Sequence, residues 1–159
     1  MYRKIMVPLD GSELAECVLP HVEAIARGCA PTTVIFLRVA EPVRVYPGAT
    51  TLGGEYTFTD QDWKQLEVER WAATEDYLKG IVGRVKYDGV SVRSEVLMGE
   101  VAEGIADYAT KNDADLIIMA THGRSGISRW VLGSVADRVL RSSCVPVLMV
   151  RAPGCEPRA

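Results

Sequence analysis

The sequence predicts an α/β fold built on a doubly wound parallel sheet of five strands. Short apolar runs of strand length alternate along the chain with segments of helical period. The run at 116–120 (LIIMA) is continuously apolar, as expected for a parallel strand that has helices on both faces. With 159 residues, 48% hydrophobic and 25% charged, the chain has the size of one globular domain. We expect this domain to cover residues 1–152, followed by a polar tail at 153–159.

The first predicted unit is a strand, a helix and a second strand. Residues 3–9 (RKIMVPL) are apolar and stop at 10–12 (DGS), a turn and helix-cap sequence. In the helix that follows, apolar residues recur at helical spacing; we expect His21 to lie on this face in a structural role and Pro20 to kink the helix. The run at 33–39 (TVIFLRV) is the second strand, so the three elements predict a right-handed βαβ unit.

The middle of the chain predicts a long loop and two further units. Residues 40–60 are rich in glycine and proline without a consistent period, and we interpret them as a flap beside the site. Residues 62–86 return to a helical period. Residues 91–97 alternate, which predicts a strand with one wetter face and an edge-like position. A helix at 98–111 then leads into the strand at 116–120.

The last helix is expected after Ser134, and residues 145–151 (VPVLMVR) form the final strand. If the first three strands wind one way and the last two the other, the strand order is 3-2-1-4-5. The switch point then lies between the strands that end at Asp10 and Ala120, and open α/β sheets bind ligands in such a crevice. The final strand is expected at a sheet edge, and we predict a homodimer through the segment from Pro146 to Arg151.

Composition excludes several function classes. A net charge of -3, a pI near 5.4 and the lack of a basic stripe argue against nucleic-acid binding. The amino-terminal apolar run is too short for a signal peptide or a membrane span, so a cytoplasmic location is expected. The four cysteines lie far apart, which predicts neither a zinc site nor a disulfide framework. Most are expected to be small core residues, with Cys155 as an exposed thiol.

The segment after residues 116–120 has the layout of an anion site. A loop at 121–126 (THGRSG) is followed by Gly133 and Ser134. Ser134 is expected to cap the last helix, whose free backbone N–H groups and positive dipole end would point toward the loop. The common alternatives fail, because the chain has no Walker loop and no G-x-G-x-x-G, and the sequence GRSG is one residue short of a nucleophile elbow. The pattern therefore favours a bound phosphate.

Two paired motifs connect the chain to a known family. Ala120-x-x-Gly123 is followed by nine residues and Gly133-Ser134, and the first strand ends in the sequence VPLDGS. On these motifs the chain resembles the universal stress protein family, whose ATP-binding members carry G-x-x-G, nine residues and G-[ST], and V-P-x-D-G-S. The resemblance covers nearly the whole chain. It implies a Rossmann-like, adenine nucleotide alpha hydrolase-like fold, with ATP and Mg²⁺ as ligands.

The resemblance also implies roles for individual residues. Asp10 would lie near the ribose or the metal-phosphate group, in indirect contact with Mg²⁺; the Val39 backbone would read the adenine edge, and Met119 would pack beside the nucleoside. The predicted nucleotide site consists of Pro8, Asp10, Val39, Met119, Ala120, His122, Gly123, Arg124, Gly133, Ser134 and Val135.

Several of these residues have a simpler interpretation. Asp10 is also suited to a turn before the first helix. His122 is better suited to ordering the loop by a hydrogen bond than to acid-base catalysis, and Arg124 is either a phosphate ligand or a solvated charge. Ala120 departs from the family pattern, since glycine is expected there. Its methyl group is tolerated if φ is negative but crowds the nucleotide if the backbone approaches it closely.

The leading hypothesis is a cytoplasmic ATP-binding module in stress response or regulation, at most a slow ATPase. Fast phosphoryl transfer needs a lysine on the phosphates and an identifiable base, which the sequence lacks. The alternative is an interaction module of the same fold whose loop is degenerate at Ala120. A third, weaker hypothesis is a small hydrolase that uses Ser125 or Ser134 with His122.

Overall fold

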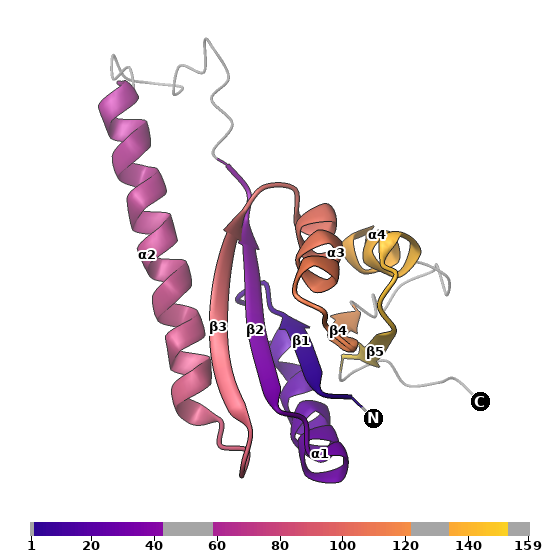
Figure 1. Ribbon diagram of the computed structural model, residues 1–159. Helices are drawn as coiled ribbons and strands as arrows, with labels where there is room; N and C mark the ends of the chain where they lie inside the picture. The colour runs from indigo at the N-terminus through magenta and orange to yellow at the C-terminus, as the bar shows by residue number, and fades with distance from the viewer. Residues whose placement is uncertain (1, 43–58, 122–133, 153–159) are drawn as a thin grey trace, which may run out of the picture.

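The computed structural model describes residues 2–42, 59–121 and 134–152, in which five strands form one sheet between two layers of helices (Figure 1). The predicted flap at 40–60 lies mostly outside these residues. In chain order the elements are β1 (Lys4–Pro8), the 3-10 helix η1 (Ala15–Val18), α1 (Leu19–Cys29), β2 (Thr33–Ala40), α2 (Asp60–Arg84), β3 (Ser91–Met98), α3 (Val101–Lys111), β4 (Leu116–Thr121), α4 (Ser134–Ser142) and β5 (Val147–Arg151).

The strands are all parallel and lie in the order β3-β2-β1-β4-β5. This confirms the predicted doubly wound sheet. Strand β1 is central: Ile5 pairs with Val34 of β2 on one side and with Leu116 of β4 on the other. Strands β3 and β5 are the two edges, as their sequences predicted, and the edge-like alternation of β3 appears as a strand without a fully buried residue.

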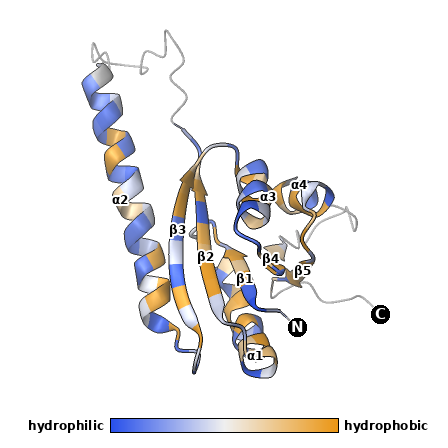
Figure 2. Ribbon diagram, viewed as in Figure 1, coloured by the Kyte–Doolittle hydropathy of each residue, from blue (hydrophilic) through white to orange (hydrophobic). Residues whose placement is uncertain are grey.

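The core has two apolar clusters, one on each face of the sheet, because successive residues of a strand point to opposite faces. Ile5 and Val7 of β1 contribute to the cluster beneath α1 and α2. Met6 contributes to the cluster beneath α3 and α4. Figure 2 shows the resulting contrast between hydrophobic inner strands and a largely hydrophilic α2.

The first helical segment differs from its prediction. Residues Ala15–Val18 form a 3-10 turn, and α1 begins only at Leu19, which places Pro20 in the first turn. Proline is well tolerated there because its missing N–H has no intrahelical partner, so the predicted kink was wrong. A 3-10 turn advances about 120° per residue instead of about 100°, which rotates the buried face. The buried residues of α1 are Val22 and Ala26, and His21 is exposed, so its predicted place on the buried face was wrong.

Helix α2 is long and only partly packed. It begins at a capping box in which the Thr59 side chain accepts a hydrogen bond from Asp62 N, and the Asp62 carboxylate accepts one from Thr59 N. Its buried residues are Thr74, Leu78 and Ile81, all in the second half. The first half extends beyond the sheet (Figure 1).

Two further observations concern the described part of the chain. None of its helices has the length and apolar character needed to cross a bilayer. Cys17 and Cys29 are half-buried and Cys144 is exposed. Cys144 is therefore not the small core residue that the sequence predicted for most of the cysteines, and Cys155 lies outside the described residues.

Candidate functional site

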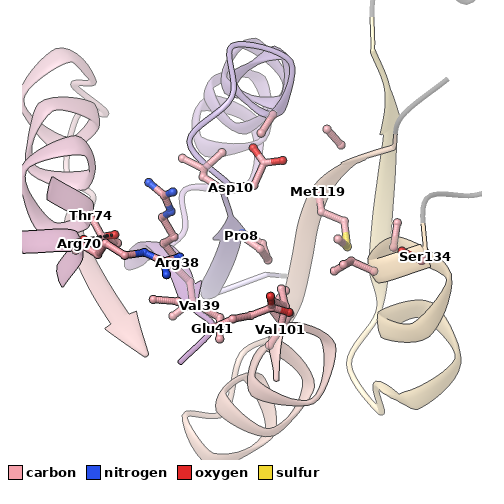
Figure 3. A pocket seen from close by; sticks show the side chains of 18 of the residues that line it. Pro8, Asp10, Arg38, Val39, Glu41, Arg70, Thr74, Val101, Met119 and Ser134 are labelled. Carbon is pink, nitrogen blue, oxygen red and sulfur yellow. Dashed lines mark hydrogen bonds between the residues drawn. The ribbon is translucent and has the colours of Figure 1, made fainter. Parts of the chain in front are cut away.

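A cavity of about 910 Å³ opens at the carboxyl ends of β1, β2 and β4. This is the switch point of the sheet, where neighbouring connections run to opposite faces and leave a crevice. Its size falls within the range of small-molecule sites, roughly 300–1,000 Å³. Figure 3 shows its lining, with α2 on one side and the start of α4 on the other.

The cavity brings together the predicted site residues that the structure describes. Those that line it are Pro8, Asp10, Val39, Met119, Ala120, Ser134 and Val135. They come from four elements and the turn after β1, so the fold alone makes them neighbours. The remaining predicted residues, His122, Gly123, Arg124 and Gly133, lie outside the described residues. The same holds for Ser125, so the serine–histidine hydrolase hypothesis stays a hypothesis.

The floor of the cavity is apolar. Pro8 ends β1 and is buried, and Met119 belongs to the cluster on the α3 and α4 face. Helix α3 approaches β2 closely because Gly104 has no side chain: a Cβ atom there would lie 3.2 Å from Val39 Cγ1. The close packing fixes Val39 at the edge of the cavity, where its backbone is at the end of a strand.

The wall on the α4 side is the start of that helix. Ser134 is exposed and is the first residue of α4, one position inside the N-cap place that the sequence predicted for it. Backbone N–H groups of a first turn have no intrahelical acceptor, and the helix dipole makes this end positive. The carboxylate of Asp137 in this turn accepts a hydrogen bond from Arg141 Nε at 2.9 Å, which offsets its negative charge.

Asp10 has the turn geometry that its simpler interpretation predicted. Its Oδ1 accepts hydrogen bonds from Ser12 N at 2.9 Å and Ser12 Oγ at 2.6 Å, and Ser12 Oγ accepts one from Ala15 N at 3.1 Å. Gly11 between them has a φ of +88°, which favours glycine. Asp10 also lines the cavity and is exposed, so the turn places its carboxyl group where a ligand can reach it.

Ala120 is compatible with an open site. It lies within β4, pairs with Val150, and is not among the described residues that have a positive φ. Its methyl group packs against the cluster on the α1 face, whereas Met119 faces the α4 side. The departure from glycine therefore introduces no backbone strain.

Two arginines of the lining were missed by the sequence analysis. Arg38 belongs to β2 and Arg70 to α2, and both line the cavity together with Glu41. The signal for Arg38 was present, since a single charged residue interrupts the apolar run TVIFLRV just before the strand ends. Arg70 carried no signal, because one charge among many on a polar helix is normally solvated.

The guanidinium group of Arg38 is held from two sides. Its central carbon lies 5.5 Å from the centroid of the Tyr77 ring, within cation–π range. A Cβ atom on Gly11 would come within 2.7 Å of Arg38 Nη1, so the guanidinium also rests against that glycine. Burial raises the pKa of Tyr77 far above its usual range, and the nearby carboxylate of Glu16 adds to the effect. That carboxylate binds Arg84 at 2.8 Å, and the Tyr77 hydroxyl itself makes no hydrogen bond in the described part of the chain.

Metal binding has little support from side chains alone. Within residues 2–42, 59–121 and 134–152, no three His, Cys, Asp or Glu side chains are grouped as metal ligands. Asp10 and Glu41 are the carboxylates of the cavity lining. A Mg²⁺ ion commonly binds one or two carboxylates and completes its shell with phosphate oxygens and water, so this lining suits a metal that arrives with a phosphate ligand.

Comparison with known proteins agrees with this geometry. The model of the universal stress protein family matches residues 1–151. Universal stress protein MJ0531 of Methanocaldococcus jannaschii is 30% identical over 154 residues, covering 96% of this chain and 84% of that protein. The solved structure of protein MJ0577 from the same organism superposes with a TM-score of 0.75 at 28% identity, covering 97% of this chain and 99% of the other. A family protein from Arabidopsis thaliana, solved with AMP bound, shares the fold with a TM-score of 0.62 at 16% identity, covering 98% and 95%. The chain belongs to the universal stress protein family.

Proposed function

We propose that this protein binds ATP, together with Mg²⁺, in the cavity at the switch point. The observation that carries the proposal is the convergence of seven predicted site residues, from four elements and one turn, on a single cavity of about 910 Å³. Two kinds of surface meet there, an apolar floor that suits a nucleoside and a helix amino end that suits phosphate. The AMP bound by the Arabidopsis relative supports the choice of an adenine nucleotide.

In this proposal each part of the nucleotide contacts a different part of the cavity lining. The nucleoside lies over Val39 and Met119, and the phosphates extend toward Ser134 and Val135 at the start of α4. Asp10, oriented by its hydrogen bonds to Ser12, faces the ribose or a water molecule of the Mg²⁺ shell.

We further propose a regulatory role in the cytoplasm, in stress response, with residues 1–152 as the one nucleotide-binding domain. The described lining offers arginines but no lysine, and fast phosphoryl transfer also needs a base or a group that positions water. Hydrolysis, where it occurs, is therefore expected to be slow. The geometry of Ala120 favours this proposal over a degenerate, nucleotide-free module.

One experiment separates these two functions. Freshly purified protein is denatured by heat and the released small molecules are analysed by chromatography, and ATP binding is measured by calorimetry for the natural chain and for Ala120→Gly. We expect adenine nucleotide in the released fraction and affinities within about threefold of each other. A natural chain that binds no ATP, with binding restored in Ala120→Gly, would instead establish the degenerate module.

We also propose that the protein is a homodimer through β5. This strand is a sheet edge, and unpaired edges of apolar strands are rarely left bare. Leu148 on β5 and Leu140 on α4 are 38% and 44% exposed, so this side of the molecule offers apolar side chains to a partner.

A further inference from the structure

The side chain of Arg38 lies on the face of the sheet opposite to the proposed phosphate wall. Along β2, Phe36 belongs to the cluster beneath α1 and α2, whereas Leu37 belongs to the cluster beneath α3 and α4. Alternation along a strand places Arg38 on the same face as Phe36. The contact of its guanidinium with Tyr77 of α2 agrees with this placement.

The charge of Arg38 is held in place, and no ion pair within the described residues neutralises it. Arg27, Arg84, Arg138 and Arg141 each pair with a carboxylate. Within the described residues Arg38 has no ion pair and no hydrogen bond from its guanidinium, although Asp10 and Glu41 line the same cavity. Its faces are occupied by Tyr77 and Gly11. Its in-plane N–H groups therefore remain available as donors at the cavity surface, where a half-buried cation favours an anionic partner.

A second arginine, Arg70, lines the cavity on the same side as Arg38. Arg70 and Thr74 are one helical turn apart on α2, and Tyr77 follows three residues later, so the three share the helix face that looks onto β2. Arg70 and Thr74 both line the cavity. Figure 3 shows Arg38 and Arg70 on the α2 side and Ser134 on the opposite side, with Pro8 and Met119 between them.

The two positive regions lie on opposite sides of the cavity, so each can face a different anionic group of one ligand. Strand β1 separates β2 from β4 in the sheet, and two strand spacings amount to about 10 Å. The start of α4 and the guanidinium of Arg38 also lie on opposite faces of the sheet, which adds to this separation.

We propose that Arg38 and Arg70 form a second anion subsite in the nucleotide cavity, which selects nucleotides that carry a further phosphoryl group on the ribose, away from the 5′ phosphates. Tyr77 is the positioning residue for Arg38. The proposal rests on the proposed function, because the first anionic end of the ligand is the phosphate group bound at α4.

The test compares ligands that differ in the second phosphate alone. Calorimetry measures the binding of AMP, adenosine 3′,5′-bisphosphate and adenosine 2′,5′-bisphosphate to the natural protein, and to Arg38→Met and Arg70→Met. We expect at least one bisphosphate to bind about tenfold or more tightly than AMP, as a charge-assisted contact allows. Arg38→Met should remove this advantage, so that the bisphosphate binds no more tightly than AMP does to the same variant.

Control variants test whether Arg38 and its contact with Tyr77 cause the tighter binding of the bisphosphate. Arg27→Met removes an equal charge from the exposed Arg27–Glu23 pair on α1 and should change none of the affinities. Tyr77→Phe keeps the ring beneath Arg38 and should preserve the advantage of the bisphosphate, whereas Tyr77→Leu should reduce it. Arg70 is exposed, so Arg70→Met tests the subsite in a protein whose core is unchanged.

The outcomes distinguish the two proposals. If AMP binds but neither bisphosphate binds more tightly, or if Arg38→Met weakens all three ligands equally, the second subsite is wrong and the nucleotide site stands. If no adenine nucleotide binds the natural protein, both proposals fail.

Discussion

Asp115 is a residue whose role follows directly from its hydrogen bonds. Its Oδ2 accepts one from Arg3 N at 2.9 Å and one from Lys4 N at 2.8 Å, so a single carboxylate joins the start of β4 to the start of β1. The two backbone donors favour the charged form and lower the pKa of this carboxyl group below its usual value. The carboxylate thus stabilises the sheet only while it is ionised.

This predicts a pH-dependent effect of Asp115→Asn. A lowered folded-state pKa gives stability that is present above the unfolded value, about 3.9, and is lost as the pH falls through the folded value. At pH 7 the variant should unfold at lower urea concentration than the natural protein, and the difference should shrink below about pH 4. Urea midpoints between pH 7 and pH 3 provide the measurement. A difference that does not change with pH would show that the charge of Asp115 is unimportant.

The positions of some single residues could be predicted from the sequence and those of others could not. Asp10 could be placed because it follows an apolar strand, and strand ends meet at one edge of a parallel sheet. Met119 was placed through the resemblance to the family. His21 was misplaced because the 3-10 turn before α1 changes the angular phase of the helix, which an apolar pattern at α-helical spacing does not reveal. Arg70 could not be found because its importance depends on how far α2 extends beside β2.

At the scale of elements, replacing a glycine by alanine should have opposite effects on stability in α2 and in the turn that follows it. Gly80 lies within the helix, and a Cβ atom added there would meet no other atom within 4 Å, whereas Gly89 lies in the turn before β3 at a φ of +74°. We expect Gly80→Ala to raise the free energy of unfolding by about 1 kcal/mol through helix propensity. Gly89→Ala should lower it by a similar amount, about 1 kcal/mol, because a Cβ atom disfavours positive φ. Denaturant titration measures both, and equal effects of the same sign would contradict the assigned conformations.

The two halves of α2 should also differ in local stability. Thr74, Leu78 and Ile81 are buried in the second half, whereas no described residue from 61 to 73 is. Opening the first half therefore exposes little apolar surface and should cost less free energy. Hydrogen exchange followed by mass spectrometry or NMR should show faster exchange at 64–71 than at 78–82. Uniform protection along the helix would indicate a partner that covers its first half.

Strands were predicted more reliably than helix ends. Short apolar runs of strand length, bounded by turn sequences, allowed β1, β2, β4 and β5 to be located from sequence. The start of α1 was harder to predict, because Ser12 is a common cap residue whereas the helix begins at Leu19 without a side-chain cap. The edge position of β3 could be predicted because its residues alternate in polarity.

At the scale of the whole molecule, the alternation of strands and helices predicted a doubly wound parallel sheet. Its strand order was predicted on the condition that the first three strands wind one way and the last two the other, and the structure has that order. The cavity followed in turn, because this order has one switch point. Its second wall could not be predicted, since it depends on the distance between α2 and β2.

The proposed dimer can be tested by changing one exposed leucine on the β5 edge. Leu148→Lys places a charge on that edge and should convert a dimer into a monomer at micromolar concentration, as measured by sedimentation velocity. Leu66→Lys is the matched control, because Leu66 on α2 has nearly the same exposure, 36% against 38%, far from β5 in the fold. Dissociation in the control alone, or a monomeric natural protein, would rule out the β5 interface.

The central position of β1 has a consequence for synthesis on the ribosome. Strand β2 follows β1 closely in the chain, but Asp115, which binds the start of β1 ahead of β4, lies 111 residues after Lys4. During synthesis β1 can therefore pair with β2 early, while the side of β1 that pairs with β4 is still unpaired. An unpaired apolar strand is a template for misassembly. We therefore expect the incomplete polypeptide to be most prone to misassembly in the interval before β4 has been synthesised.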